Sequence, residues 1–321
     1  MTEIPIYLSK RTCDLVKFIS ALLVLSSHVG SVALGKQYAS THWMFYVMAT
    51  QNGYIGVAIF FFLSGYGLME SNKKSHLTLS DFISRRLMKI YLPVVLVSAI
   101  WIIIAPPYVL PISCKSIFYR LLWGFADPVM WFIRVLIPLY IAFYLFTVLD
   151  NKIRTTVPVW ILLTVCVVYS ILSICYNDNI IHHSVPMFAL GVMTSYYKDK
   201  GTLLCVLLIC GCGVPIGLSA FLTSHPLTGF IHCYFDYILI ALMVLVMSKY
   251  RINKGLPTLL TTIIFDIYLV HFKLLEIGSR FISLESLLIC ILPVTLIVAW
   301  CFMRLRTALI DNRIIRAYER K

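Results

Sequence analysis

Three ionisable residues stand in the first long apolar segment of the chain: Asp14, Lys17 and His28 in CDLVKFISALLVLSSHVG, residues 13–30. Ionisable side chains are costly in hydrocarbon, so within a membrane span they commonly serve function. On a helix of 3.6 residues per turn, Lys17 and His28 fall within about 20° of each other, and Asp14 lies about 60° from Lys17. With a rise of 1.5 Å per residue, His28 stands roughly 16 Å along the helix from Lys17. The spacing predicts that a cation and a titratable imidazole face one cavity.

Such a pair suits the transfer of an acyl group to a hydroxyl. A histidine has an ordinary pKa near 6.5, so it can take a proton from a hydroxyl and later release it. A cation roughly 16 Å away from this base suits a donor with a charged head and a long thin arm. Acyl-coenzyme A has that shape, with phosphates at one end and a thioester at the other.

A structural role also fits these residues. Lys17 would reach the lipid headgroups, Asp14 would pair with Lys17 three residues on, and His28 would hydrogen-bond to a neighbouring helix. The alignment of all three on one face favours the functional interpretation.

The composition shows what must position these residues. Of 321 residues 60% are hydrophobic and 13% are charged, and the mean hydropathy of +0.89 indicates a polytopic membrane protein. The net charge of +13 comes from scattered basic residues, so we expect no nucleic-acid partner. The ten Cys lack metal-ligand spacing, and we expect His182 and His183, beside Asp178, to form an exposed polar loop rather than a metal site.

The apolar pattern predicts an all-α fold of about ten transmembrane helices, because a span needs roughly 20 apolar residues. The second span has a broken or re-entrant start at QNGYIG (51–56), and the sixth is short. We expect one transmembrane domain over residues 1–303 and a basic cytoplasmic tail over 304–321 that lies on anionic lipid. The predicted spans are 14–34, 43–69, 90–106, 128–149, 157–175, 183–197, 202–222, 230–248, 258–276 and 285–303.

Lysine and arginine lie mostly on one side of these spans. Of the 27 such residues, 21 fall on one side and two, Arg134 and Lys273, lie within spans. Only Lys36, Lys115, Arg120 and Arg280 fall on the other side. Positive residues concentrate in cytoplasmic loops, so this asymmetry predicts that both termini are cytoplasmic. An even number of spans agrees with it.

Six segments follow one another in a recognisable order. They are Lys17-FISALLVLSS-His28 preceded by Arg11 and Asp14, GVAIFFFLSGYGL (56–68), FISRRLMKIYLP (82–93), MWFIRVLIPLY (130–140), VPMFALG (185–191) and FDIYLVH (265–271). Together they resemble the integral-membrane acyltransferase-3 family, which includes bacterial O-acetyltransferases of lipopolysaccharide O-antigen, capsule and peptidoglycan. Each segment alone is a weak match, and the ordered set covers most of the chain.

The resemblance implies roles for particular residues. His28 would be the catalytic histidine, with Lys17 and Asp14 beside it in the motif. Arg86 and Lys89 would hold the phosphates of the acyl donor, helped by Arg85 and Arg11. Lys89 stands where the family has a second arginine, so a bidentate fork is lost and the positive charge is kept. Alternatively, RRLMK is a positively charged membrane anchor.

Other residues in the matched segments are additional candidates, each with a structural alternative. His271 would be either a catalytic group or a core histidine, and Asp266 would pair with Lys273 or Arg134. Ser64, Gly65 and Tyr66 would either pack against a neighbouring helix or border the donor site. The additional candidates are Ser64, Tyr66, Trp131, Arg134, Asp266, Tyr268 and His271.

The implied function is a multi-pass O-acetyltransferase of the bacterial inner membrane. It would move acetyl from acetyl-CoA, as a substrate and not a bound cofactor, to a hydroxyl of a surface polysaccharide or its lipid-linked precursor. We expect no bound metal. Besides acyl-CoA and the glycan acceptor, the expected partners are membrane lipids. A proton-coupled transporter or flippase is the alternative function, and a non-catalytic membrane scaffold is the third. The acceptor, the acyl length and the oligomeric state stay open at this level.

Overall fold

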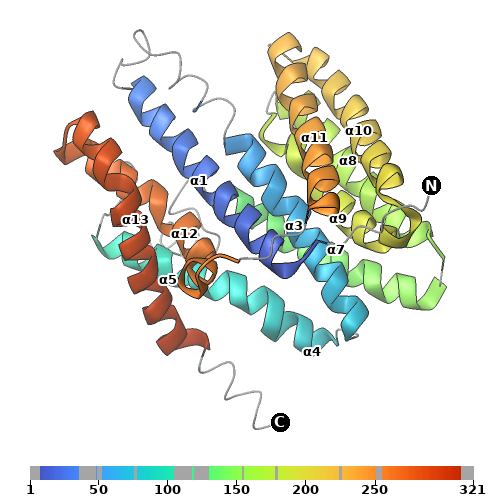
Figure 1. Cartoon of the computed structure of the whole chain (residues 1–321), viewed down its shortest axis with the longest axis horizontal. Helices are drawn as coiled ribbons and strands as arrows, with labels where there is room; N and C mark the ends of the chain where they lie inside the picture. Colours follow the sequence, from blue (N-terminus) through green and yellow to red (C-terminus); the bar gives the residue numbers. More distant parts are fainter. Residues whose placement is uncertain are drawn as a thin grey trace. The chain divides into compact units, whose positions relative to one another are not determined.

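The computed structural model describes residues 8–35, 48, 53–75, 78–104, 118, 130–153, 155–177, 180–223, 226–250 and 255–311. Within these ranges all regular structure is helical (Figure 1). Nine helical segments of the described ranges are long and apolar enough to cross a membrane. The chain is therefore an all-α, multi-pass membrane protein, as the composition predicts.

The long helices match the predicted spans closely. The second, predicted over 43–69, is described only from Gly53, because 43–47 and 49–52 lie outside the described residues. The long helices are α1 (Lys10–Gly35), α3 (Gly53–Lys74), α5 (Met88–Ile104), α7 (Trp131–Ile153), α8 (Val157–Asn177), α10 (Thr202–Ser219), α11 (Pro226–Lys249), α12 (Thr258–Phe281) and α13 (Leu284–Arg306).

Short helical elements connect or extend these helices. The α-helix Leu79–Phe82, the π-helix Ile83–Leu87 and α5 follow one another without a break, so residues 79–104 form a single span. The short elements are α4 (Leu79–Phe82), η3 (Ile83–Leu87), η5 (Ile180–Ser184), α9 (Pro186–Tyr196), η6 (Lys198–Lys200), η7 (Ala220–Leu222) and η8 (Thr307–Asp311).

The sixth predicted span, 183–197, contains a short helix, as the sequence predicts, and this helix is buried. Its helix α9 has 11 residues, which at 1.5 Å per residue gives roughly 16 Å, about half of a bilayer core. Every residue from Pro186 to Ser195 is buried. The segment is apolar because it is an interior helix, and an apolar run alone does not distinguish an interior helix from a span.

The chain divides into two compact units. Unit 1 contains residues 1–24, 50–76 and 141–256, and unit 2 contains residues 25–49, 77–140 and 257–321. Helices α1 and α7 contribute to both units, so each unit is assembled from segments far apart in the sequence.

Within unit 1, helices α3 and α9 pack backbone to backbone. A Cβ atom added to Gly65 would lie 2.0 Å from the carbonyl oxygen of Phe188, and one added to Gly191 would lie 2.0 Å from the carbonyl oxygen of Phe62. Small residues allow helices to approach this closely in membranes, where van der Waals packing drives their association. Gly65 of LSGYG and Gly191 of FALG are thus required by the packing of unit 1.

The loop before α9 is also part of the core of unit 1. His183 is fully buried, and its Nε2 lies 2.9 Å from Oδ2 of Asp236 on α11. The Tyr237 hydroxyl donates a hydrogen bond of 2.9 Å to the His183 carbonyl. The prediction of an exposed loop is wrong for His183, since the buried carboxylate of Asp236, 53 residues away, supplies a partner that the local sequence does not reveal.

Within unit 2, the C-terminal half of α1 packs on α12 and α13, which lie side by side (Figure 1). The contact is a buried apolar cluster that includes residues of all three helices. Its members are Leu25, Val29, Ala33, Leu275, Leu284, Leu287 and Ile291. This cluster fixes the part of α1 that carries residue 28 against α12.

Helix α13 continues beyond the predicted end of the membrane domain at residue 303. It runs to Arg306, and η8 follows to Asp311. Residues 304–306 of the predicted tail thus belong to the last helix, and 312–321 lie outside the described residues.

We expect Gly65→Ala or Gly191→Ala to destabilise the protein by about 1–3 kcal/mol or more, because the new methyl group would overlap a backbone carbonyl. Gly67→Ala is the matched control, since no atom lies within 4 Å of its added Cβ. Thermal unfolding of the detergent-solubilised protein measures the difference. Equal melting temperatures for Gly65→Ala and Gly67→Ala would contradict the backbone contact.

We expect Asp236→Ala to lower the free energy of unfolding by about 3–5 kcal/mol, because it leaves the buried His183 imidazole without its carboxylate. Tyr237→Phe removes one hydrogen bond to the same loop and should cost about 0.5–1.5 kcal/mol. Denaturant titration in detergent compares the two variants. A larger effect of Tyr237→Phe would argue against the contact between His183 and Asp236 as the stronger of the two interactions.

Candidate functional site

His28 lies on α1 where that helix packs against α12 in unit 2. Its ring centre is 5.2 Å from the ring centre of His271, with a tilt of 36° between the planes. The ring of Phe272 meets it edge-on at 5.1 Å. Leu25 and Val29, on either side in the sequence, are buried in the apolar cluster. The partly buried imidazole is therefore held by rings of α12.

His271 is 1% exposed, and its hydrogen bonds fix where its proton lies. Nδ1 is 2.8 Å from the carbonyl oxygen of Tyr268 and 3.1 Å from that of Ile267. A carbonyl oxygen only accepts, so Nδ1 carries a hydrogen. Nε2 is buried and has no hydrogen-bond partner among the described residues. Neutral His271 thus has its acceptor lone pair on Nε2.

Aromatic contacts continue from His271 along unit 2. The Tyr268 ring lies 5.7 Å from the His271 ring and 5.3 Å from the Phe132 ring. Trp131 and Arg134 lie on the first turn of α7 and are partly buried, and the Arg134 guanidinium is within electrostatic range of Tyr268. Unit 2 therefore brings His28, Tyr268 and His271 together, with Arg134 nearby.

Asp266 forms a different pair from the one predicted. Its fully buried carboxylate accepts two hydrogen bonds from Arg306, from Nε at 3.0 Å and from a terminal nitrogen at 2.9 Å. Lys273 instead contacts Glu276 at 2.5 Å, and Glu276 also binds Arg280 at 2.7 Å. The predicted Asp266 to Lys273 pair is wrong, because Arg306 returns to α12 from 40 residues further along the chain.

The predicted donor-binding cations of unit 2 follow one another on one helical segment. Arg85 and Arg86 lie in the π-helical turn η3, and Lys89 lies in the first turn of α5. Arg85 is exposed and pairs with Asp81 at 3.1 Å, Arg86 is partly buried, and Lys89 is exposed. All three cations therefore lie within about two helical turns near the start of the span 79–104.

The predicted residues of the N-terminal half of α1 belong to unit 1. Helix α1 is continuous from Lys10 to Gly35, so Lys17 and His28 do lie on one helix. Asp14 and Lys17 are partly buried, and no ion pair joins them within the described residues. The pair needed for the structural role of Asp14 is therefore missing, and the shared cavity of Lys17 and His28 stays a prediction.

The side chain of Arg11 lies over the backbone before α12. A Cβ added to Gly255 would be 3.3 Å from Cγ of Arg11, while Arg11 as a whole is exposed. Its apolar stem is thus packed, and its charged head remains accessible.

Ser64 and Tyr66 lie in the α3 segment that packs on α9. Tyr66 is 3% exposed, and its hydroxyl accepts a hydrogen bond of 3.4 Å from the backbone N–H of Leu8. This bond ties the segment before α1 to α3, which supports the packing alternative for Tyr66. Ser64 is partly buried beside Gly65.

Two contributors were not identified from the sequence. Phe272 contacts His28 directly, and its signal was its place directly after His271, the last residue of a matched segment. Arg306 had no local signal, because its role depends on how α13 returns to α12. As for metals, the described residues contain no group of three or more His, Cys, Asp or Glu side chains that could hold an ion.

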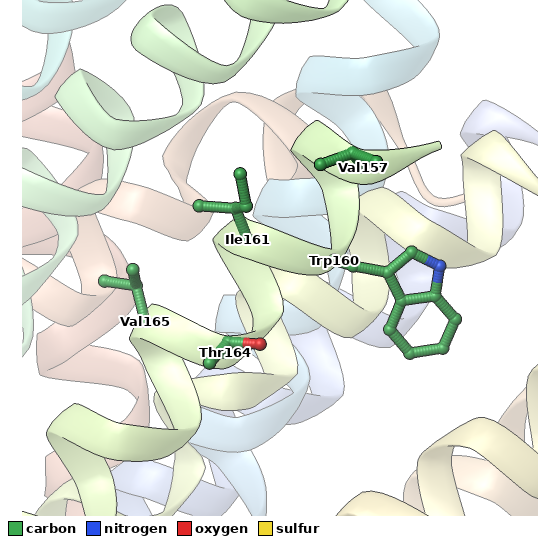
Figure 2. A pocket seen from close by; sticks show the side chains of 5 residues that line it. All are labelled: Val157, Trp160, Ile161, Thr164 and Val165. Carbon is green, nitrogen blue, oxygen red and sulfur yellow. The ribbon is translucent and has the colours of Figure 1, made fainter. Parts of the chain in front are cut away.

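A hollow on the surface of α8 is lined by none of the predicted site residues. Side chains of one face of this single helix line it, as Figure 2 shows. Trp160 and Val165 are among its exposed residues, with 43% and 56% of their surface accessible. An exposed apolar face on a membrane helix suits contact with lipid, so we assign this hollow no chemistry. The lining residues are Val157, Trp160, Ile161, Thr164 and Val165.

Comparison with known proteins identifies the family. A family model described as an acyltransferase domain, that of acyltransferase family 3, matches residues 12–304. No curated protein and no solved structure matches the chain. The match spans nearly all of the helices described above and includes every predicted site residue except Arg11. The chain is therefore a membrane acyltransferase that belongs to the acyltransferase-3 family.

Proposed function

We propose that this protein is an O-acetyltransferase of the bacterial cytoplasmic membrane. It would transfer acetyl from acetyl-CoA to a hydroxyl of a surface polysaccharide or of its lipid-linked precursor. The observation that carries this proposal is the setting of His28, a partly buried imidazole in a membrane helix, held against the rings of His271 and Phe272. Membership of an acyltransferase family supports the same chemistry.

In the proposed reaction His28 acts as a general base. It takes the proton of the acceptor hydroxyl while the hydroxyl oxygen attacks the thioester carbonyl carbon. The carbon–sulfur bond then breaks, and the leaving coenzyme A thiolate takes the proton from His28. His28 ends as it began, so the mechanism needs no covalent acyl-enzyme.

The donor phosphates would bind the cations of η3 and α5. Phosphate binding favours several positive charges close together, and Arg86 and Lys89 are three residues apart on one continuous helical segment. Arg85 shares its charge with Asp81, so we propose a smaller contribution from it. Lys17 and Arg11, the other cations of the motif, would add to the attraction for the donor on the cytoplasmic side.

We expect His28→Ala to lower acetyl transfer by about 100-fold or more, since the general base is removed. Ser31→Ala is the matched control, because Ser31 is an exposed residue of the same helix. Mass spectrometry of surface glycans from cells carrying each variant measures the added acetyl groups and identifies the acceptor. Undiminished acetylation by a correctly inserted His28→Ala protein would overturn the mechanism.

We expect Arg86→Ala and Lys89→Ala each to raise the KM for acetyl-CoA by about tenfold, with a smaller effect on kcat, because each removes a charge that binds the donor phosphates. Lys89→Arg should retain a low KM, since the charge is preserved. Lys74→Ala, at an exposed basic residue of α3, is the control. Steady-state kinetics with purified protein provide the comparison, and an equal rise in KM for Lys74→Ala would contradict a specific phosphate site.

A further inference from the structure

His271 offers His28 a hydrogen-bond acceptor whose position is fixed. The Nδ1 hydrogen is directed at the carbonyl oxygens of Tyr268 and Ile267, one turn earlier on the same helix. Nε2 is therefore the nitrogen directed away from the backbone of α12. Buried polar atoms in folded proteins nearly always have a partner, yet Nε2 of His271 has none among the described residues. A histidine that served packing alone would leave this acceptor unsatisfied, which destabilises the fold.

The His28 ring lies next to the His271 ring. At a separation of 5.2 Å between the ring centres, two imidazoles can bring one nitrogen of each to about 3 Å, the length of a hydrogen bond. Phe272 covers another part of the His28 ring and offers no hydrogen-bonding group. The Tyr268 ring also lies near His271, and the Tyr268 carbonyl already accepts from Nδ1.

We propose that His271 is a positioning residue for His28. A hydrogen bond between the two rings is absent from the structure, where Nε2 of His271 has no partner among the described residues, and a turn of the His28 ring would form it. Nε2 would then accept a hydrogen bond from one ring N–H of His28, and the other ring nitrogen of His28 would face the acceptor hydroxyl with its lone pair. This inference rests on the proposed function of His28 as the general base, and it assigns to His271 a role that does not require contact with substrate.

The proton balance of the reaction follows from this arrangement. When His28 takes the hydroxyl proton, both of its nitrogens carry hydrogen and its ring becomes positive. The hydrogen bond to Nε2 of His271 then becomes charge-assisted, and such bonds are about twice as strong as neutral ones. The leaving thiolate removes the transferred proton, and the bond returns to its neutral form. His271 keeps its own proton on Nδ1 throughout, because two carbonyl oxygens hold it there.

Two variants of His271 distinguish this role from packing. In His271→Gln the side-chain amide reaches the position of Nε2 and can turn its carbonyl oxygen toward His28. In His271→Asn the amide reaches only the position of Nδ1, so the contact with the backbone survives and the acceptor for His28 is lost. Both replacements are polar and smaller than histidine, so we expect the two variants to have similar melting temperatures.

We expect His271→Asn to lower kcat by about tenfold or more with an unchanged KM for acetyl-CoA, since the partner that orients an imidazole is lost. His271→Gln should keep kcat within about threefold of the original value. Steady-state kinetics on purified full-length protein measure both constants. Equal kcat values for the two variants, whether high or low, would overturn the proposal, and so would a loss confined to KM.

The outcome for His28 separates this inference from the proposed function. If His28→Ala is inactive while His271→Asn and His271→Gln have the same kcat, the acyl-transfer mechanism stands and the positioning role of His271 fails. If His28→Ala retains full activity, the proposed function itself fails, whatever the result at His271.

Discussion

The packing of the C-terminal half of α1 against α12 is the interaction on which the chemistry of this protein depends. The apolar cluster of Leu25, Val29 and Ala33 with residues of α12 and α13 fixes the rotation of α1 about its axis. That rotation turns His28 toward His271 and Phe272. Burial of apolar surface thus determines the surroundings of the His28 ring, although no apolar residue takes part in the proposed reaction.

Unit 2 also shows how a membrane protein keeps charged groups within its helices. Asp266 receives both nitrogens of the Arg306 fork, which is the strongest geometry available to a buried carboxylate. Lys273 and Arg280 share Glu276 on the same helix. These pairs satisfy the charges of α12 locally. The two groups of the proposed site are different, because Nε2 of His271 has no hydrogen-bond partner among the described residues and His28 lies against the rings of His271 and Phe272.

Unit 1 relies on close backbone packing together with buried polar contacts. The glycines that let α3 and α9 touch lie in two of the segments that resemble the family, LSGYG and FALG. The same unit buries the side chains of His183 and Asp236 in contact with each other. Burying either polar side chain without the other would cost free energy. Gly65 and Gly191, the motif glycines of unit 1, therefore have a structural role. Tyr66 has one too, through its hydrogen bond from the Leu8 backbone.

The sequence alone determined the fold class and most helix positions, because apolar runs of about 20 residues report directly on membrane spans. It also identified the family and placed His28 and His271 in matched segments. The structure decided what local patterns do not encode. An 11-residue apolar run became the interior helix α9, His183 became a core residue, and Asp266 found Arg306 in place of Lys273. Each of these outcomes depends on partners 40 or more residues away, whereas periodicity and motif spacing describe only one helix at a time. The contact between His28 and His271 was decided in the same way, since it requires helices separated by more than 200 residues to pack together.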